Sequence, residues 1–278
     1  MTMTRSQGSK SCSAYPSDAR PPQAMGHSVE NKSSVVRSVF QTPAWYLKNT
    51  HNIRIRAETV RQFLKAESFT RILDIGCGDG SLSLPLLNSA RHLALLDFSE
   101  GMLSAARAQI PRELLPHVEI FQQNALSAAF PPRSYDVILC VGVLAHVDSP
   151  EALLDRIASW LKPGGSLILQ YTEADHVMSI ITRSLESIRS VLRSEKYERN
   201  QTRGSQLLDG LRRRGFELQA SFRYSQPLLG MQRIAGPEIL YRMMRFVFGV
   251  YPNGRLSSWG NERLYHLKAK GLVQRDAG

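Results

Sequence analysis

Three glycines within five residues, placed directly after a short apolar run, restrict the fold of this chain more than any other feature. The run Ile72–Ile75 has the composition of a short buried strand. Gly76–Gly80 then lacks most Cβ atoms where a backbone must turn tightly or approach a ligand, and Ser81–Leu87 reads as the opening of a helix despite Pro85. A strand, a glycine loop and a helix in this order are typical of an α/β fold.

The rest of the chain continues this alternation. Apolar runs predict further strands at 92–96, 118–122, 135–141, 166–171, 216–224 and 264–270. Helical patterns predict helices at 53–64, 101–109, 150–161, 206–214 and 237–248, and Lys162-Pro163-Gly164-Gly165 should stop the third of them. We therefore expect a doubly wound, mostly parallel, seven-stranded sheet, with its ligand site at the carboxyl ends of the strands.

Composition divides the chain into parts. Residues 1–40 are rich in Ser and Pro and poor in apolar periodicity, which predicts a disordered tail without a secretory signal. Residues 41–278 form the predicted domain, with helical cap insertions at about 173–204 and 226–262 over the mouth of the site. No apolar run is long enough to span a membrane, and three scattered cysteines fit a reducing, cytoplasmic location without a metal site.

The glycine loop does not fit a dinucleotide or triphosphate site. Its third glycine, Gly80, comes too early for the G-x-G-x-x-G pattern, and no Lys-Ser/Thr pair of a phosphate loop follows. Asp97, about 20 residues further on, ends the second predicted strand, where a carboxylate can accept hydrogen bonds from both hydroxyls of a ribose. The pairing of loop and carboxylate predicts a nucleoside ligand.

Asp74–Gly80 matches an acidic-x-Gly-x-Gly-x-Gly motif throughout, and here the sequence resembles the class I, Rossmann-like S-adenosylmethionine-dependent methyltransferases. The resemblance covers roughly residues 45–172 and continues more loosely to Lys270. It implies S-adenosylmethionine as the cofactor, with Asp74 near its amino group and Asp97 on its ribose. Further contacts implied by the resemblance come from Gly76, Cys77, Gly78, Phe98, Met102, Asn124, Ala125, Cys140, Val141, Tyr46 and Arg56.

Two of these positions carry specific expectations. Asn124 stands where the family often places Asp near the adenine amino group, so its side-chain oxygen would accept a hydrogen bond without a charge. Arg56 either pairs with the methionine carboxylate or is an ordinary solvated charge on a helix. Cys77 and Cys140 are read as small buried residues.

His146, just after the fourth predicted strand, is the candidate general base, and a residue that only shapes its loop is the alternative. Methyl transfer requires few side chains, because the sulfonium already activates the methyl group and the enzyme chiefly aligns the acceptor.

The acceptor is the least constrained part of the prediction. The net charge of +11 is concentrated in residues 176–278, which carry 18 basic and eight acidic side chains. Together with the apolar helix at 237–248, this favours a small apolar, anionic or lipid-like acceptor, with O-methylation as one option. An RNA methyltransferase that uses the basic C-terminal third and a non-catalytic cofactor-binding protein are the alternatives. The sequence assigns no oligomeric state.

Overall fold

The computed structural model describes residues 50–180, 200, 202–225, 235–249 and 256–270. The predicted tail at 1–40 and Tyr46 lie outside these residues, as do 181–199, 201, 226–234 and 250–255 of the predicted insertions. No helix in the part that is described is both long and apolar enough to cross a membrane.

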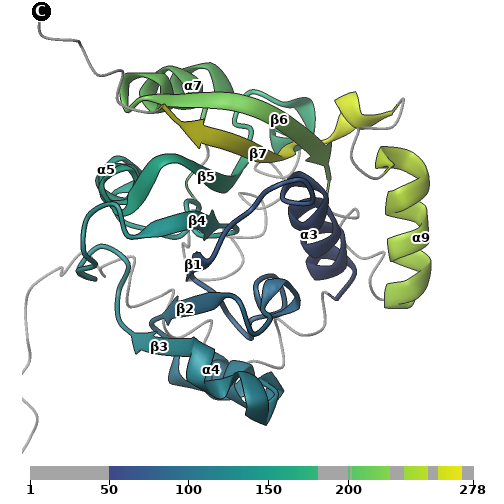
Figure 1. Ribbon diagram of the computed structural model, residues 1–278. Coiled ribbons are helices and arrows are strands. Elements are labelled where there is room, and N and C mark those ends of the chain that lie inside the picture. The colour runs from purple at the N-terminus through teal and green to yellow at the C-terminus, as the bar shows by residue number, and fades with distance from the viewer. Residues whose placement is uncertain (1–49, 181–199, 201, 226–234, 250–255, 271–278) are drawn as a thin grey trace, which may run out of the picture. The chain divides into compact units, whose positions relative to one another are not determined.

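A seven-stranded sheet runs through the described residues, as the sequence predicts (Figure 1). Its strands are β1 (Arg71–Ile75), β2 (His92–Asp97), β3 (Val118–Gln122), β4 (Tyr135–Cys140), β5 (Leu161–Thr172), β6 (Phe216–Tyr224) and β7 (Glu262–Ala269). Their order is β3-β2-β1-β4-β5-β7-β6, and only β7 runs antiparallel to its neighbours. The strand order therefore reverses between β1 and β4, where a doubly wound sheet places its ligand.

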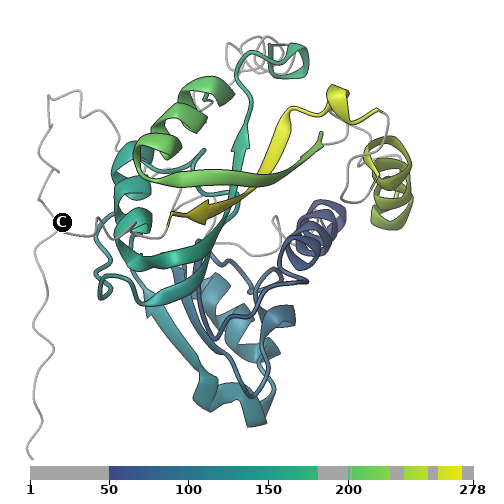
Figure 2. The same ribbon diagram turned by 45° about the horizontal axis from the view of Figure 1, so that its top comes forward.

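Helices cover both faces of this sheet (Figures 1 and 2). One apolar cluster joins the sheet to α3 (Thr50–Phe63), α4 (Glu100–Gln109) and α9 (Pro237–Phe248). The other joins it to α5 (Pro150–Trp160) and α7 (Gly204–Arg213). Short 3-10 helices are η1 (Leu84–Leu86), η2 (Arg112–His117) and η3 (Ser257–Trp259).

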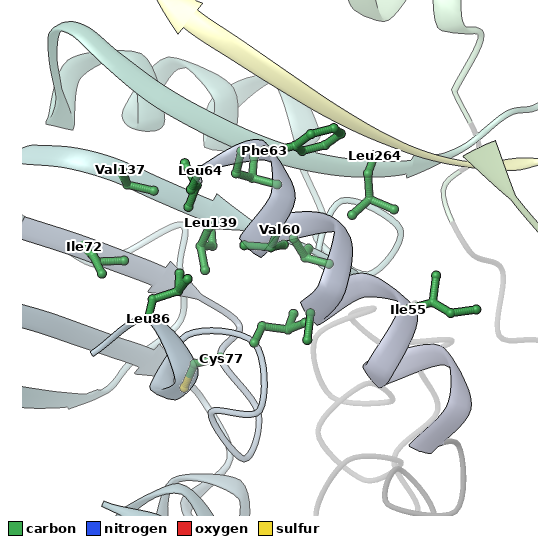
Figure 3. Packing of buried hydrophobic residues seen from close by; sticks show 14 of the residues in the cluster. Ile55, Val60, Phe63, Leu64, Ile72, Cys77, Leu86, Val137, Leu139 and Leu264 are labelled. Carbon is green, nitrogen blue, oxygen red and sulfur yellow. The ribbon is translucent and has the colours of Figure 1, made fainter. Parts of the chain in front are cut away.

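The helix α3 lies against the sheet through one apolar stripe. Val60 and Leu64 are buried in the same cluster as Ile72 of β1 and Leu139 of β4, and Figure 3 shows these side chains together. Burying such a side chain fully contributes roughly 1.5 to 3 kcal/mol. This packing fixes α3 against one face of the sheet, over β1 and β4.

The helix α9 packs on α3 rather than standing apart from the core. Its Leu240, Tyr241, Met244 and Phe248 are buried, whereas Ile239 and Phe246 are exposed. The Tyr241 hydroxyl donates to Glu58 of α3 at 2.5 Å, and the Arg54 guanidinium of α3 lies 3.7 Å from the Tyr241 ring centroid. The second predicted insertion thus contributes a helix to the domain.

One local prediction is wrong, and one strand begins earlier than predicted. Ser81–Leu87 contains only the 3-10 helix η1, with Pro85 in its first positions, and Leu87 is already extended, so no α-helix develops. The segment Lys162-Pro163-Gly164-Gly165 ends α5 at Trp160, as predicted, and the strand β5 begins earlier than the predicted Ser166, at Leu161. The register with β4 shifts here, because Tyr135 lies opposite Leu161 and Val137 opposite Ser166, so residues 162–165 form an irregularity within the strand.

Candidate functional site

The glycine loop after β1 is held against the end of β2. The backbone N–H groups of Gly76 and Cys77 both donate to the Leu96 carbonyl, at 2.7 and 3.1 Å. Gly76 and Gly78 have φ values of 65° and 56°, in the left-handed region that glycine adopts without a Cβ penalty. The predicted tight turn is therefore present at the carboxyl end of β1.

Asp97 closes this loop from the end of β2. One carboxylate oxygen accepts the Gly78 N–H at 2.9 Å and the other accepts the Ser99 N–H at 2.9 Å. Burial raises the pKa of Asp97, and hydrogen bonds from the Ser99, Gly78 and Phe98 backbones oppose the shift. Because each carboxylate oxygen has two lone pairs, both retain capacity to accept a hydroxyl from a ligand.

Asp74 is a second buried carboxylate, at the loop's entrance. Burial raises its pKa to about 7, the charges of Asp97 and Asp79 raise it too, and Ser83 opposes them. Within the part of the chain that the structure describes, its buried Oδ2 accepts no hydrogen bond of good geometry. A buried carboxylate oxygen without a donor is costly, so this atom fits a site that a cationic or hydrogen-bonding ligand completes.

Three of the predicted cofactor-binding residues are buried in the core. Cys77, Cys140 and Val141 are buried apolar residues, and burial raises the pKa of both thiols. Neither cysteine is therefore suited to act as a nucleophile. The interpretation of both as small buried residues is confirmed.

The residues expected beside adenine follow β2 and β3, and Met102 lies in the first turn of α4. Met102 is 2% exposed and belongs to neither apolar cluster, and Phe98 is half-buried. Asn124 is exposed, and its Oδ1 accepts the Leu126 N–H at 2.9 Å. That bond occupies one lone pair of the oxygen predicted to meet a ligand, while Ala125 packs against the second cluster.

The loop after β4 meets the glycine loop. A Cβ added to Gly76 would lie 2.5 Å from Cγ2 of Val143, so the two loops are in contact there. His146 follows in the same loop and is half-buried. Its backbone N–H donates to the Val143 carbonyl at 2.8 Å. The structure thus places His146 in the loop next to the glycine loop.

Asn200 fixes the loop that carries His146, which the sequence did not indicate. Its side-chain amide donates to the Leu144 and Val147 carbonyls at 3.1 and 2.7 Å, and its backbone N–H donates to Ala145 at 2.9 Å. No local pattern marks Asn200, since it lies 53 residues from Val147 in the chain.

Arg56 reaches the same edge of the sheet and is not an ordinary solvated charge. Its Nε donates to the hydroxyl of Tyr224 at 2.7 Å, and its Nη1 lies 3.4 Å from where a Cβ on Gly142 would stand. Gln170 donates to the Tyr224 hydroxyl at 3.1 Å and to the Glu262 carboxylate at 2.7 Å. A buried polar cluster of Arg56, Tyr224, Gln170 and Glu262 therefore borders the loop after β4.

Sequence reasoning missed three members of this cluster. Gln170 offered one signal, because it is the single polar residue in the run Leu167–Tyr171. Glu262 belongs to β7, which pairs with β5, and Tyr224 belongs to β6, which pairs with β7. These pairings exist only in the folded sheet.

The arginines at the end of α7 are engaged in the fold. Arg214 pairs with Glu151 and Asp155 of α5 at 2.7 and 2.6 Å, and these contacts raise its pKa. Arg212 pairs with Asp209 within α7 at 3.2 Å. The run Arg212-Arg213-Arg214 therefore helps to hold α7 against α5 through Arg214, in addition to placing positive charge on the surface.

Comparison with known families gives one broad match. A family model described as a methyltransferase domain matches residues 48–221. A demethylmenaquinone methyltransferase from Listeria welshimeri is 29% identical over 148 residues, covering 50% of this chain and 62% of the relative. A ubiquinone biosynthesis O-methyltransferase from Aeromonas salmonicida is 35% identical over 102 residues, covering 36% and 42%. The match therefore spans less than two thirds of either relative.

Solved structures share the fold at low identity. A magnesium protoporphyrin IX methyltransferase from Synechocystis with bound SAH has a TM-score of 0.60 and 15% identity, covering 86% of this chain and all of that chain. A possible histamine N-methyltransferase from Thermotoga maritima has a TM-score of 0.55 and 18% identity, covering 86% and 97%. These likenesses establish the Rossmann-like arrangement of the sheet.

Proposed function

This chain belongs to the methyltransferase-domain family, and from that membership we propose that it transfers the methyl group of S-adenosylmethionine to a small-molecule acceptor. The observation that carries the proposal is the hydrogen bond between the glycine loop and the carboxylate at the end of β2. Asp97 accepts the Gly78 N–H and keeps lone pairs for a ligand. The loop geometry and the second buried carboxylate, Asp74, support it.

The residues present fit this cofactor. Asp97 would hold the ribose hydroxyls, and the buried Asp74 Oδ2 would accept from the amino group. Phe98 and Met102 would flank the adenine, and Arg56 would approach the methionine carboxylate. When bound, the cofactor supplies an activated methyl group, so the chain has to align the acceptor and exclude water.

We propose a small apolar acceptor, anionic or lipid-like in character, with oxygen as the accepting atom. The relatives named for quinone methylation and the apolar helix α9 on α3 support an apolar molecule. His146 would take the proton from the acceptor hydroxyl, since it lies in the loop that touches the glycine loop.

Label transfer tests the proposed activity. We expect purified protein incubated with methyl-labelled S-adenosylmethionine and fractionated cell extracts to label a low-mass, organic-soluble product. His146→Gln should lower the rate by about 10²- to 10⁴-fold, the usual contribution of a general base, and leave cofactor affinity unchanged. Label found only in RNA would replace the proposal with the nucleic-acid alternative. Cofactor binding without any labelled product would favour a non-catalytic protein.

The raised pKa of Asp74 predicts how cofactor affinity depends on pH. Below about 7 the carboxyl is largely protonated and cannot pair with an ammonium group, so affinity should rise as pH increases through 7 and then level off. For the free protein the sign is opposite, because a raised folded-state pKa means that stability is lost as pH rises through 7.

Calorimetric titration of S-adenosylmethionine between pH 5.5 and 8.5 measures the first effect, and thermal unfolding of the free protein measures the second. Asp74→Asn is the matched control, because every other titrating group remains. The two profiles should differ by up to about tenfold in affinity for each pH unit below 7, as one linked proton requires. Parallel profiles for the two proteins would exclude Asp74 as the linked group.

A further inference from the structure

Asn200 holds the loop after β4 on both sides of His146. Its side-chain amide donates to the carbonyls of Leu144 and Val147 at 3.1 and 2.7 Å. Its backbone N–H donates to the Ala145 carbonyl at 2.9 Å. Because these carbonyls precede and follow His146, the backbone that carries the imidazole is held by a residue distant in the chain.

The chain that follows this residue is tied to the end of β5. The Thr202 N–H donates to the Thr172 carbonyl at 3.3 Å, and the Thr202 carbonyl accepts the Ala174 N–H at 3.1 Å. The Gly204 N–H, at the start of α7, donates to the Glu173 carboxylate at 2.8 Å. Since β4 and β5 are neighbours in the sheet, these contacts connect the residues that follow both strands.

Glu173 is a buried anchor for this connection. Its Oε2 accepts the Tyr171 hydroxyl at 3.2 Å and pairs with the Arg263 guanidinium at 3.0 Å. The Tyr171 hydroxyl also lies 2.7 Å from that of Tyr265. A Cβ on Gly204 would lie 2.5 Å from both the Glu173 Oε2 and the Tyr171 hydroxyl. Glycine at this position therefore allows the backbone to approach a carboxylate that is fixed from the other side.

We propose that Asn200 is a positioning residue for methyl transfer, which places His146, and that Glu173 in turn places Asn200. The inference rests on the proposed function, because it takes His146 as the general base. It adds two residues that act on the reaction only through that base. A general base has to lie within hydrogen-bond reach of the proton that it takes, and a misplacement of about 1 Å can lower a rate about 10²-fold.

The two ends of the loop after β4 are held by different contacts. Val143, at its start, is in contact with the glycine loop at Gly76. The part that carries His146 is held by Asn200. Loss of the Asn200 amide should therefore displace His146 and leave the cofactor-binding loop in place.

A double-mutant cycle on the full chain tests the proposal. The measurement is the initial rate of label transfer from saturating methyl-labelled S-adenosylmethionine to one organic-soluble fraction of cell extract. Asn200→Ala and the isosteric Asn200→Asp, whose carboxylate cannot donate, should each lower this rate about 10-fold or more. In a His146→Gln background they should lower it less than about 2-fold, because no base remains to be positioned. Calorimetry should show unchanged affinity for S-adenosylhomocysteine.

Gly204→Ala tests the role of Glu173 from a second position. The added Cβ should push the backbone away from the carboxylate, because Glu173 and Tyr171 are both buried and held by other contacts. We expect the rate to fall by about 3- to 10-fold, and to fall little further when Asn200→Ala is already present.

Two controls match these substitutions. On α7, a Cβ on Gly210 would lie no closer than 3.3 Å to another atom, the end of the flexible Arg214 side chain. Next to the start of α7, Arg203 makes an exposed ion pair with Asp175 at 3.3 Å. Gly210→Ala and Arg203→Ala should each leave the rate within about 2-fold of the unmodified protein.

Hydrogen exchange of the loop amides gives a readout that does not depend on turnover. In the free protein, the amides of residues 142–148 should exchange about 10-fold or more rapidly in Asn200→Ala and in Gly204→Ala, because the loop opens more often. The same amides should exchange at the unmodified rate in Arg203→Ala.

The outcomes separate this inference from the proposed function. Equal losses of rate for Asn200→Ala with and without His146 would overturn the positioning role and leave these contacts a structural one. Unchanged exchange of the loop, or a fall in S-adenosylhomocysteine affinity, would overturn it as well. A His146→Gln variant as active as the unmodified protein would remove the base that is positioned, while methyl transfer stands. Absence of any labelled product from the unmodified protein would instead contradict the proposed function, and this inference with it.

Discussion

Asp97→Ala should weaken binding of S-adenosylmethionine by about 10- to 100-fold, which corresponds to about 1 to 3 kcal/mol. The substitution leaves two ribose hydroxyls without acceptors. It also releases the N–H groups of Gly78 and Ser99, so the glycine loop loses its tie to β2 at that point. The loss of a ligand contact and the loosening of the loop act in the same direction.

Isothermal titration measures this effect, and Glu100→Ala is its control. Glu100 is an exposed carboxylate three positions further on, in the first turn of α4, so its removal alters the local charge without touching the loop. The sheet should remain folded in Asp97→Ala, as judged by a cooperative unfolding transition. An affinity equal to that of the unmodified protein would mean that Asp97 serves the loop and not the ligand.

Gly76→Ala should lower the free energy of unfolding by about 2 to 5 kcal/mol. A left-handed residue with a Cβ costs about 1 to 2 kcal/mol, and forcing that Cβ against a packed neighbour costs about 1 to 3 kcal/mol. Here φ is 65° and the added carbon would lie 2.5 Å from Cγ2 of Val143. Urea unfolding measures the change, and cofactor binding should be lost with the loop geometry.

Two controls divide this effect into its parts. Gly164 has a φ of 75° but no atom within 4 Å of an added Cβ, so Gly164→Ala should cost only the conformational part. The double variant Gly76→Ala with Val143→Ala should recover the steric part relative to Gly76→Ala. If Gly76→Ala and Gly164→Ala destabilise the protein equally, the contact between the two loops is not tight in solution.

Local sequence patterns predicted most of the strands and helices of the fold. The strands at 72–75, 92–96, 118–122 and 135–141 and the helices at 101–109 and 150–161 match the structure within one or two residues. Serine caps help to fix the starts of these two helices, at Ser99 and Ser149. The helix expected at Ser81–Leu87 failed because Pro85 and an extended Leu87 limit it to a single 3-10 turn.

For the candidate site, the sequence predicts where the central residues lie, but not what each does toward a ligand. Asp74, Gly76, Gly78 and Asp97 stand at the ends of adjacent parallel strands, so strand prediction alone brings them together. The role of each toward a ligand stays a prediction, as does that of His146. Tyr46 lies outside the described residues.

The sequence by itself determined the alternation of strands and helices, the glycine loop and the carboxylate that ends the second strand, because these are set by neighbours within a few residues. Only the tertiary structure decided that Arg56, Gln170, Tyr224 and Glu262 meet, and that Asn200 holds the loop of His146. Those contacts join residues 50 or more positions apart. The meeting of Gln170, Tyr224 and Glu262 depends on β7 inserting antiparallel between β5 and β6, which the hydrophobic pattern of any one strand does not encode.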